Sequence, residues 1–360
     1  MAAPKNILVY QIGSLGDTIV SIPSYRAIRR HFGDDATIRV LHNVPVGQRA
    51  TPNDILSSTG LINGSVSYVQ YPSRLLTLFG LWRVMLKAKA DSIVYVLPGQ
   101  RPPASVQRDK QFFKFCGVKS QIGFESADQR MFEPRSENVP HILCRHESAI
   151  RLDRLSNDGI RVEPEDMSIP LIKFSDELLD WSTEWLRSKS RVGEVPLVAI
   201  APGANKPACI WPAERYVELS NRLSGEGFQV VLVGGKLETQ LGETMAKRIP
   251  NSINAAGQLT VMQTAAIINQ TKLFIGNDTG TSHLAAAAGT PIIAVFSDQN
   301  VAGQWEPLGA GNIIIRRSVP CGGCRLTFCN VPGHPCMDNI TVDNVWDIVY
   351  QKLISSATSV

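Results

Sequence analysis

Apolar and polar positions alternate in a regular order along the first part of the chain. Short apolar runs of strand length occur at 7–12, 37–42, 66–71 and 92–97. Stretches with the apolar spacing of amphipathic helices lie between some of them, at 22–32 and 75–89. Strands that alternate with helices form parallel sheets, so this pattern predicts one α/β domain.

The alternation restarts after a less regular region at 135–173 and a polar helix expected at 176–189. Strands are predicted at 197–201, 229–233, 272–276, 292–296 and 312–316, and helices at 213–224, 238–248 and 261–270. Runs such as VVLVGG and PIIAVF are typical of parallel strands covered on both faces. The pattern predicts two doubly wound α/β domains that face a cleft, at 1–172 and 173–340.

Composition agrees with this organisation. Of the 360 residues, 44% are hydrophobic, which is enough for two packed cores. No apolar run has the length needed to span a bilayer, and the start, MAAPKNILVYQIG, lacks the regions of a secretory signal. Three of the seven cysteines, Cys116, Cys144 and Cys209, are scattered and indicate no disulfide framework. We therefore expect a cytoplasmic protein.

The net charge of +4 hides an asymmetry between the two halves. Residues 1–170 carry 21 Lys and Arg against 16 Asp and Glu. In one segment only Asp91 and Asp109 oppose a cluster of basic residues: Arg74, Arg83, Lys87, Lys89, Arg101, Arg108, Lys110, Lys114 and Lys119. This cluster favours an anionic partner or a membrane surface, with a solvated helix face as the alternative. Nucleic acid is not expected, because aromatic residues do not interleave with the cluster and no recognition motif accompanies it.

The segment GNDTGTSHLAAAAGTP at 276–291 joins an apolar strand to a tightly packed helix. In the turn between them, Asp278, Thr279 and Gly280 offer a cap, a hydroxyl and a bare backbone where helix N–H groups point outward. That environment can hold a phosphate or diphosphate, and His283 in the first helical turn could reach the same anion. The alternative is that Asp278 or Thr279 only caps the helix and that His283 is an ordinary surface histidine.

A second glycine-rich turn follows the first predicted strand. Gly13 and Gly16 let the backbone approach a ligand closely, and Asp17 lies where a helix should begin. The spacing is G-x-x-G-D, which differs from the G-x-G-x-x-G fingerprint of dinucleotide binding. Asp17 is therefore either an N-cap or a carboxylate that accepts a proton from a hydroxyl nucleophile.

Three stretches of the chain resemble the bacterial ADP-heptose:lipopolysaccharide heptosyltransferases of glycosyltransferase family 9. They are IGSLGDTIVSIPSYRAIRR at 12–30, VAIAPGANKPACIWPAERY at 198–216 and FIGNDTGTSHLAAAAGTPIIAVF at 274–296. The resemblance implies two Rossmann-like domains in the GT-B arrangement, with the acceptor bound mainly to the first and a nucleotide-sugar, ADP-heptose before others, to the second. It also implies that residues 341–360 form a C-terminal helix that packs back on the N-terminal domain.

The resemblance also implies roles for single residues. Asp17 matches the proposed general base that deprotonates the acceptor hydroxyl, in the turn that holds Gly13 and Gly16. In the second domain, the donor diphosphate would bind the turn that contains Asp278, Thr279, Gly280 and His283. Glu238 matches the carboxylate that binds the donor ribose, and Leu259 matches the side chain that packs near the base. A carboxylate can accept hydrogen bonds from both ribose hydroxyls, although Glu238 is equally a first-turn helix acid.

One position departs from the family's pattern. The family usually places a lysine two residues before the Trp-Pro pair, where it neutralises the departing diphosphate, but here Cys209 precedes Trp211 and Pro212. Lys206 lies three residues earlier, and its flexible side chain could reach the same phosphate. Lys206 is therefore the second expected catalytic residue, beside Asp17.

The mechanism that the resemblance implies is inverting transfer by direct displacement, with no catalytic metal. No D-x-D pair occurs in the cleft segments to clamp Mg²⁺. The expected acceptor is an anionic glycolipid such as lipid A-core, at the inner face of the cytoplasmic membrane. An apolar helical stripe beside the basic cluster belongs either to this membrane contact or, as is commoner, to the core: Leu75, Leu78, Phe79, Trp82, Met85 and Leu86.

The four remaining cysteines form a pattern of their own. Cys321, Cys324, Cys329 and Cys336 have C-x2-C-x4-C-x6-C spacing in a loop that also contains His334. Such thiolates can bind a structural zinc or iron ion and fix a loop with little core of its own. Free thiols or a disulfide are the alternative.

The leading prediction is thus a glycosyltransferase. Two other functions agree with the same residues. One is a nucleotide-sugar epimerase or hydrolase of the same architecture, and the other, because the family lysine is missing, is a nucleotide-binding protein without transfer activity.

Overall fold

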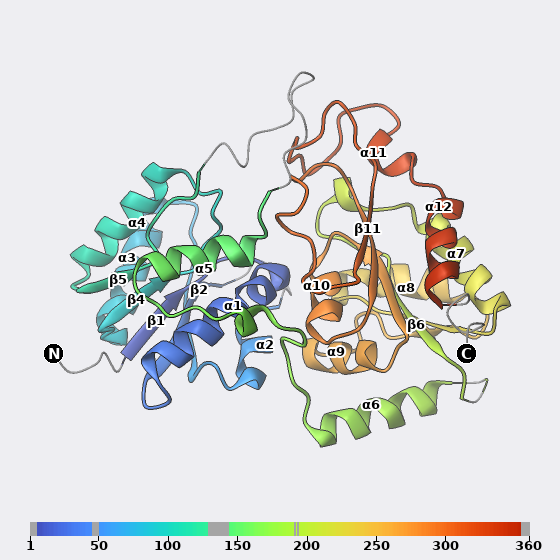
Figure 1. Ribbon diagram of the computed structural model, residues 1–360, viewed down its shortest axis with the longest axis horizontal. Coiled ribbons are helices and arrows are strands. Elements are labelled where there is room, and N and C mark those ends of the chain that lie inside the picture. The colour runs from blue at the N-terminus through green and yellow to red at the C-terminus, as the bar shows by residue number, and fades with distance from the viewer. Residues whose placement is uncertain (1–5, 45–49, 129–143, 191, 193, 354–360) are drawn as a thin grey trace. The chain divides into compact units, whose positions relative to one another are not determined.

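The structure of the chain is a computed structural model, and Figure 1 shows its ribbon. The chain forms two α/β units. The structure describes residues 6–44, 50–128, 144–190, 192 and 194–353. Packing divides the described chain between Leu171 and Ile172. Each unit is built on one parallel sheet, so the predicted fold class of two doubly wound α/β domains is confirmed.

The first unit has the strand order β3-β2-β1-β4-β5. Strand β4 lies on the opposite side of β1 from β2, so the direction in which strands are added reverses between β1 and β4. The elements in chain order are β1 (Asn6–Tyr10), α1 (Leu15–Phe32), β2 (Thr37–Asn43), α2 (Asn53–Leu56), η1 (Ser57–Thr59), β3 (Gly64–Tyr68), α3 (Arg74–Ala88), β4 (Ser92–Tyr95), α4 (Pro103–Phe115), β5 (Ser120–Ile122), α5 (Glu147–Asn157) and η3 (Pro164–Met167).

The second unit has the order β11-β10-β9-β6-β7-β8, and here the direction reverses between β6 and β9. Its elements are α6 (Asp176–Lys189), β6 (Leu197–Ala201), η4 (Pro207–Cys209), α7 (Ala213–Gly225), β7 (Gln229–Leu232), η5 (Lys236–Glu238), α8 (Thr239–Ala246), β8 (Ile253–Asn254), α9 (Val261–Asn269), β9 (Leu273–Asn277), α10 (Gly280–Ala287), β10 (Ile292–Phe296), β11 (Ile313–Arg316), α11 (Pro335–Asp338) and α12 (Val342–Leu353).

Helix α12 packs within the second unit. Its apolar residues Val342, Val345 and Val349 are buried in the same core cluster as Tyr216 and Leu219 of α7. The buried face of α12 thus packs against the core of the second unit. Residues 354–360 lie outside the described residues, and packing of the chain's end on the first unit stays a prediction.

Helix α5 is one of the elements that the apolar pattern does not predict, because charged and polar residues share its buried face with Ile150, Leu152 and Leu155. Glu147, Ser148 and Arg151 are all buried. The guanidinium of Arg151 pairs with the Glu147 carboxylate at 3.0 Å and donates to the carbonyl oxygen of Asp17 at 3.1 Å. The hydroxyl of Ser148 donates to the carbonyl oxygen of Val20 at 2.7 Å. These bonds join α5 to the first turns of α1.

Helix α1 begins at Leu15, seven residues before the apolar helical pattern at 22–32 and close to Asp17, where the glycine-rich turn indicated a helix start. Pro23 lies inside it, and a proline usually marks the first turn of a helix because it cannot donate its backbone hydrogen bond. Glycine and serine in the first turn further weaken the apolar pattern there. The extension matters for function, because it places Asp17 in the first helical turn.

The described part of the chain contains no helix that is both long and apolar enough to cross a bilayer.

Removing one partner of the buried pair should strongly destabilise the first unit. Arg151→Met leaves the Glu147 carboxylate buried without its ion-pair partner, so we expect the free energy of unfolding to fall by about 3–5 kcal/mol. Guanidinium unfolding followed by circular dichroism measures this loss. Arg248→Met is the matched control, because it breaks the exposed pair between Arg248 and Glu214 and should hardly move the transition. Equal effects of the two substitutions would contradict this role of Arg151.

Candidate functional site

Three groups of sequence-predicted residues follow strands that lie at the reversal points of the two sheets. The turn from Gly13 to Asp17 comes directly after β1, and Lys206 lies in the loop after β6. Asp278, Thr279 and Gly280 come directly after β9. In doubly wound sheets, ligands bind outside the carboxyl ends of the strands at such reversal points. Each unit therefore has one edge on which these residues collect.

On the first unit, Gly13 and Asp17 are in close contact. The backbone of Gly13 has φ +144°, and a Cβ atom added there would lie 2.4 Å from Cγ of Asp17. Only glycine leaves room for the carboxylate at this place. Gly16 is buried in the first turn of α1, and its role toward a ligand stays a prediction.

The carboxylate of Asp17 closes a capping box, so Asp17 is not the N-cap. Ser14 is the N-cap, and its backbone N–H and hydroxyl both donate to Oδ2 of Asp17, at 2.7 and 2.9 Å. The second oxygen, Oδ1, accepts no hydrogen bond from the residues that the structure describes. One oxygen of Asp17 therefore holds the turn, while the other remains able to accept a proton from a ligand.

On the second unit, the turn after β9 begins helix α10. Thr279 is the N-cap by position, and the helix starts at Gly280. The backbone N–H groups of Gly280 and Thr281 donate to no carbonyl oxygen among the described residues. They are the outward N–H groups that an anion can accept from. Asp278 does not cap the helix, since its Oδ2 accepts a hydrogen bond of 3.0 Å from Nδ2 of Asn300.

Electrostatics place Lys206 near this turn. Burial raises the pKa of Asp278 above its usual range, and the hydrogen bond from Asn300 and the positive charges of Arg316 and Lys206 oppose the rise. Lys206 is half-buried and lowers the pKa of Cys209 in the same way. The charge of Lys206 thus acts on Asp278 in the predicted diphosphate turn, and contact of Lys206 with a phosphate stays a prediction.

Cys209 cannot supply the positive charge of the lysine that the family pattern has at this position. The side chain is buried, and burial together with the nearby charge of Asp278 raises the pKa of its thiol to about 12. The thiol therefore stays protonated at neutral pH. Its sulfur contacts the amide Nε2 of Gln299 and the hydroxyl of Ser297, both in the segment after β10.

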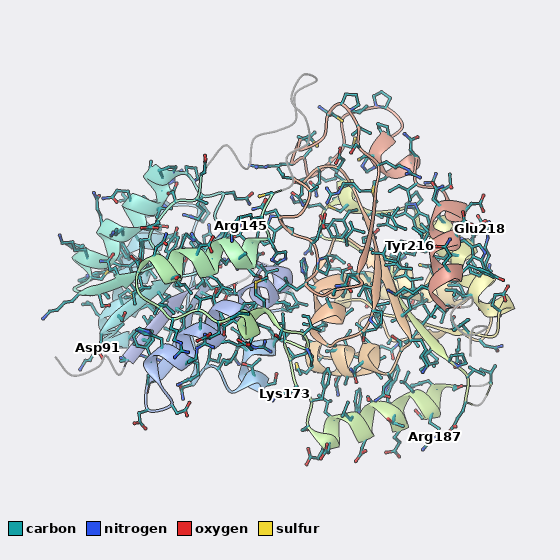
Figure 2. The ribbon with its side chains drawn as sticks, in the orientation of Figure 1. Asp91, Arg145, Lys173, Arg187, Tyr216 and Glu218 are labelled. Atoms are coloured by element: carbon teal, nitrogen blue, oxygen red, sulfur yellow. The ribbon has the colours of Figure 1, made fainter. Side chains whose placement is uncertain are left out.

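Asn277, the last residue of β9, is a site residue that the sequence analysis missed. Its Oδ1 accepts from the backbone N–H of Trp211 at 3.0 Å and from the hydroxyl of Tyr216 at 2.9 Å, and Figure 2 shows Tyr216 inside the second unit. Its Nδ2 donates to the carbonyl oxygen of Pro202 at 2.8 Å. The sequence shows only that an amide residue ends an apolar run, and its burial and its partners come from the structure. Asn277 ties together the loops after β6 and β9.

Glu238 lies between two glycine loops at the same edge. A Cβ atom on Gly203, after β6, would lie 2.4 Å from Cγ of Glu238, and one on Gly234, after β7, would lie 2.8 Å from its Cβ. Its Oε2 accepts from the backbone N–H of Gly235 at 2.8 Å, so Glu238 also caps the short helix η5. Leu259 is half-buried after β8, beside the N-cap of α9.

His283 is buried at the end of the first turn of α10, with 5% of its surface exposed. The alternative of an ordinary surface histidine is therefore wrong. Ser282, its neighbour, donates its hydroxyl hydrogen to the carbonyl oxygen of Asn277 at 2.6 Å. A direct contact of His283 with a phosphate stays a prediction.

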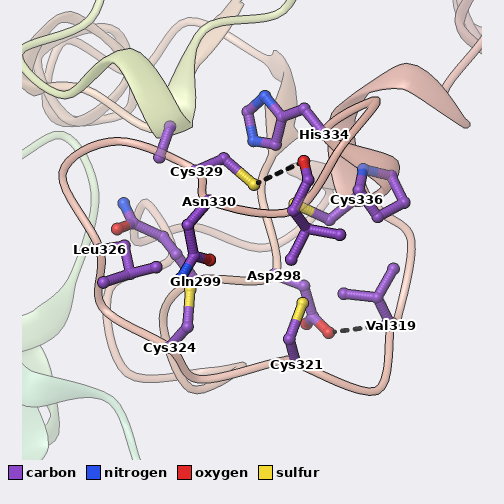
Figure 3. A pocket seen from close by; sticks show the side chains of 13 residues that line it. Asp298, Gln299, Val319, Cys321, Cys324, Leu326, Cys329, Asn330, His334 and Cys336 are labelled. Carbon is purple, nitrogen blue, oxygen red and sulfur yellow. Dashed lines mark hydrogen bonds between the residues drawn. The ribbon is translucent and has the colours of Figure 1, made fainter.

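The four cysteines of the loop at 321–336 line one small cavity of about 20 Å³, shown in Figure 3. Burial raises the pKa of the Cys321 and Cys336 thiols, and neighbouring cysteines add to the rise. Within the described residues, however, no three His, Cys, Asp or Glu side chains stand close enough together to hold a metal ion. The predicted tetrahedral ligand set is therefore not assembled in this conformation of the loop.

Comparison with known proteins agrees with this geometry. Residues 168–333 match the family model described as "Glycosyltransferase family 9 (heptosyltransferase)". Lipopolysaccharide heptosyltransferase 2 of Escherichia coli K12 is 33% identical over 225 residues, which are 59% of this chain and 61% of that protein. Two other curated heptosyltransferases are matched over 38% and 31% of their own length. The chain thus spans from about a third to three fifths of these relatives.

Solved structures share the fold over nearly the whole chain. The glycosyl transferase family 9 protein of Veillonella parvula DSM 2008 superposes with a TM-score of 0.72 at 18% identity, and 98% of each chain is covered. The ADP-heptose lipopolysaccharide heptosyltransferase II of E. coli superposes with a TM-score of 0.68 at 20% identity, over 98% of this chain and 99% of that one. At these identities the likeness shows the fold.

Proposed function

We propose that this chain is a member of glycosyltransferase family 9 and that it transfers a heptose from ADP-heptose to a lipopolysaccharide core acceptor. The observation that carries the proposal is the state of Asp17. Its Oδ2 is fixed by Ser14 at the reversal point of the first sheet, whereas Oδ1 is left for a ligand. A held carboxylate with one oxygen available suits a general base better than a helix cap alone.

The proposed step is a direct displacement at the anomeric carbon. The acceptor hydroxyl gives its proton to Oδ1 of Asp17, and its oxygen forms the new glycosidic bond. The bond from the anomeric carbon to the diphosphate breaks at the same time, and ADP leaves with the electron pair. The configuration at the anomeric carbon is therefore inverted.

Residues of the second unit would supply hydrogen-bond donors and positive charge to the leaving diphosphate. Negative charge grows on that group as the bond breaks, and the backbone N–H groups of Gly280 and Thr281 are placed to donate to it. The hydroxyl of Thr279 and the ammonium group of Lys206 add a donor and a positive charge. Glu238 would accept from the ribose hydroxyls, with Leu259 near the adenine. None of these roles requires a catalytic metal.

The acceptor and the place of the reaction are part of the same proposal. A lipid A-core acceptor is anionic and lipid-anchored, so the enzyme would act as a peripheral protein at the inner face of the cytoplasmic membrane. The excess of basic residues in the first half of the sequence supports an anionic acceptor.

A structural zinc or iron ion in the cysteine loop stays a separate proposal. Its support is the C-x2-C-x4-C-x6-C spacing and the common cavity of the four thiols. Binding would require the loop to bring at least three thiolates together, and no catalytic step depends on it. Elemental analysis of the purified protein tests this idea: one equivalent of zinc or iron, lost from Cys324→Ser, supports it, and a metal-free folded protein contradicts it.

The function is tested by donor consumption with and without acceptor. The protein is incubated with ADP-heptose, UDP-sugars and GDP-sugars, each with and without a deacylated core oligosaccharide. We expect ADP-heptose to be consumed only with acceptor. Consumption without acceptor would instead indicate a hydrolase or epimerase, and binding of ADP-heptose without any turnover would indicate a nucleotide-binding protein.

The same assay tests the base. Asp17→Asn keeps an oxygen for Ser14 but cannot take a proton, so kcat should fall by about 10²–10⁴-fold while donor affinity stays within a few-fold. Circular dichroism checks that the variant is folded. A kcat near that of the unchanged protein would leave Asp17 with its capping role alone.

Substitutions that remove or keep the positive charge of Lys206 test its role. We expect Lys206→Ala to lower kcat/KM at least about tenfold and to weaken ADP binding less, because the charge on the diphosphate is largest in the transition state. Lys206→Arg should retain part of the activity, and Lys247→Ala, at an exposed position on the same unit, is the control. Cys209→Lys is not a clean rescue, since it would put a charge at a buried position. Unchanged transfer by Lys206→Ala would assign the diphosphate to the start of α10 alone.

A further inference from the structure

Helix α3 has two apolar faces, and only one of them is used in the core. Leu81, Met85 and Ala88 are buried against the first sheet. A second stripe runs along the other side of the helix at spacing i, i+4, i+7 and i+11, and consists of Leu75, Phe79, Trp82 and Leu86. The expected core assignment is therefore right for Met85 and wrong for most of the stripe.

The outer stripe is open to solvent except at Trp82, which is half-buried. Leu75 is 78% exposed, Phe79 is 55% exposed and Leu86 is 50% exposed. The rings of Phe79 and Trp82 lie 5.8 Å apart, so the aromatic side chains form one continuous surface. Four large apolar side chains in a row on one helix mark a contact surface, because single exposed apolar residues are common but ordered stripes are not.

The charges beside this stripe have one sign. The guanidinium of Arg83 lies 6.0 Å from the centre of the Phe79 ring, and Lys87 follows one turn later on the exposed side. No acidic residue occurs between 55 and 90. By contrast, Arg101 and Arg108 of the basic cluster pair with Asp109. The unopposed positive charges of the cluster thus include those on α3.

We propose that the outer face of α3 docks the enzyme on an anionic lipid bilayer, with the helix lying in the plane of the membrane. Leu75 and Leu86 are eleven helical steps apart, which is about 16 Å, and helices of this kind bury their apolar face about 5–10 Å deep in the headgroup region. Leucine and phenylalanine enter the acyl boundary, Trp82 suits the interface, and Arg83 and Lys87 meet lipid phosphates. This inference deepens the proposed function, on which it rests for the lipid-anchored acceptor.

Charge favours a bilayer over a second copy of this chain. A symmetric dimer through α3 would place Arg83 and Lys87 of one copy opposite the same residues of the other, and the helix offers no carboxylate to pair with them. An anionic membrane supplies the missing negative charge over the whole face.

Vesicle binding tests the docking surface. Purified full-length protein is sedimented with vesicles of phosphatidylethanolamine and phosphatidylglycerol, or of phosphatidylcholine alone. We expect binding to the anionic vesicles only, weakened at least about tenfold by Phe79→Ser with Leu75→Ser and about fivefold by Arg83→Glu. Phe328→Ser and Arg187→Glu are matched controls, because both residues are exposed on the second unit and should leave binding unchanged.

Transfer to two acceptors separates this inference from the proposed function. The α3 variants should keep full transfer to a soluble deacylated acceptor and lose transfer to the same acceptor embedded in anionic vesicles. Equal vesicle binding by the unchanged protein and by the α3 variants would overturn the inference and leave the function intact. So would a dimer in analytical ultracentrifugation that the α3 variants convert to monomer. Absence of transfer to the soluble acceptor by the unchanged protein would overturn the function and not the docking surface.

Discussion

All strands of both sheets run parallel, and the position of every candidate site residue follows from that constraint. Parallel pairing sends the carboxyl ends of all strands of a sheet to one edge, so the loops that follow them meet there. Where the strand order reverses, neighbouring loops diverge to opposite faces and leave space for a ligand. Residues that are 72 positions apart in sequence, Lys206 and Asp278, are thereby close enough for one charge to change the pKa of the other group.

Buried polar side chains give these loops fixed positions. The Glu147–Arg151 pair holds the first turns of α1, where Asp17 lies, and the amide of Asn277 holds the loops after β6 and β9. Such groups lose their hydration on folding and are stable only when all partners are in place. They therefore specify one geometry for the turns, which a general base and an anion-binding helix start both need.

The apolar pattern alone predicted most of the fold, because strands that are buried on both faces are continuous apolar runs. Strand β10 and helix α6 lie where expected, and the two-domain α/β class is right. Helix α5 was missed because charged residues interrupt the apolar residues on its buried face, and β8 was missed because it has two residues. For the site, glycine and acidic residues after strands were a sufficient signal for Asp17 and for the turn at Asp278–Gly280. The role of Asn277 and the exposed stripe of α3 depend on which face of an element meets the core, and a single sequence does not state that.

The central claim is that the Asp17 carboxylate, held by the turn at Gly13, is the base of the transfer reaction. The most direct test compares Gly13→Ala with Gly33→Ala. Both glycines have positive φ, but only a Cβ atom at Gly13 would collide with Asp17, at 2.4 Å from its Cγ. We predict that Gly13→Ala lowers kcat by about 10²-fold or more at unchanged donor affinity, while Gly33→Ala does not. Equal turnover of the two folded variants would contradict the claim.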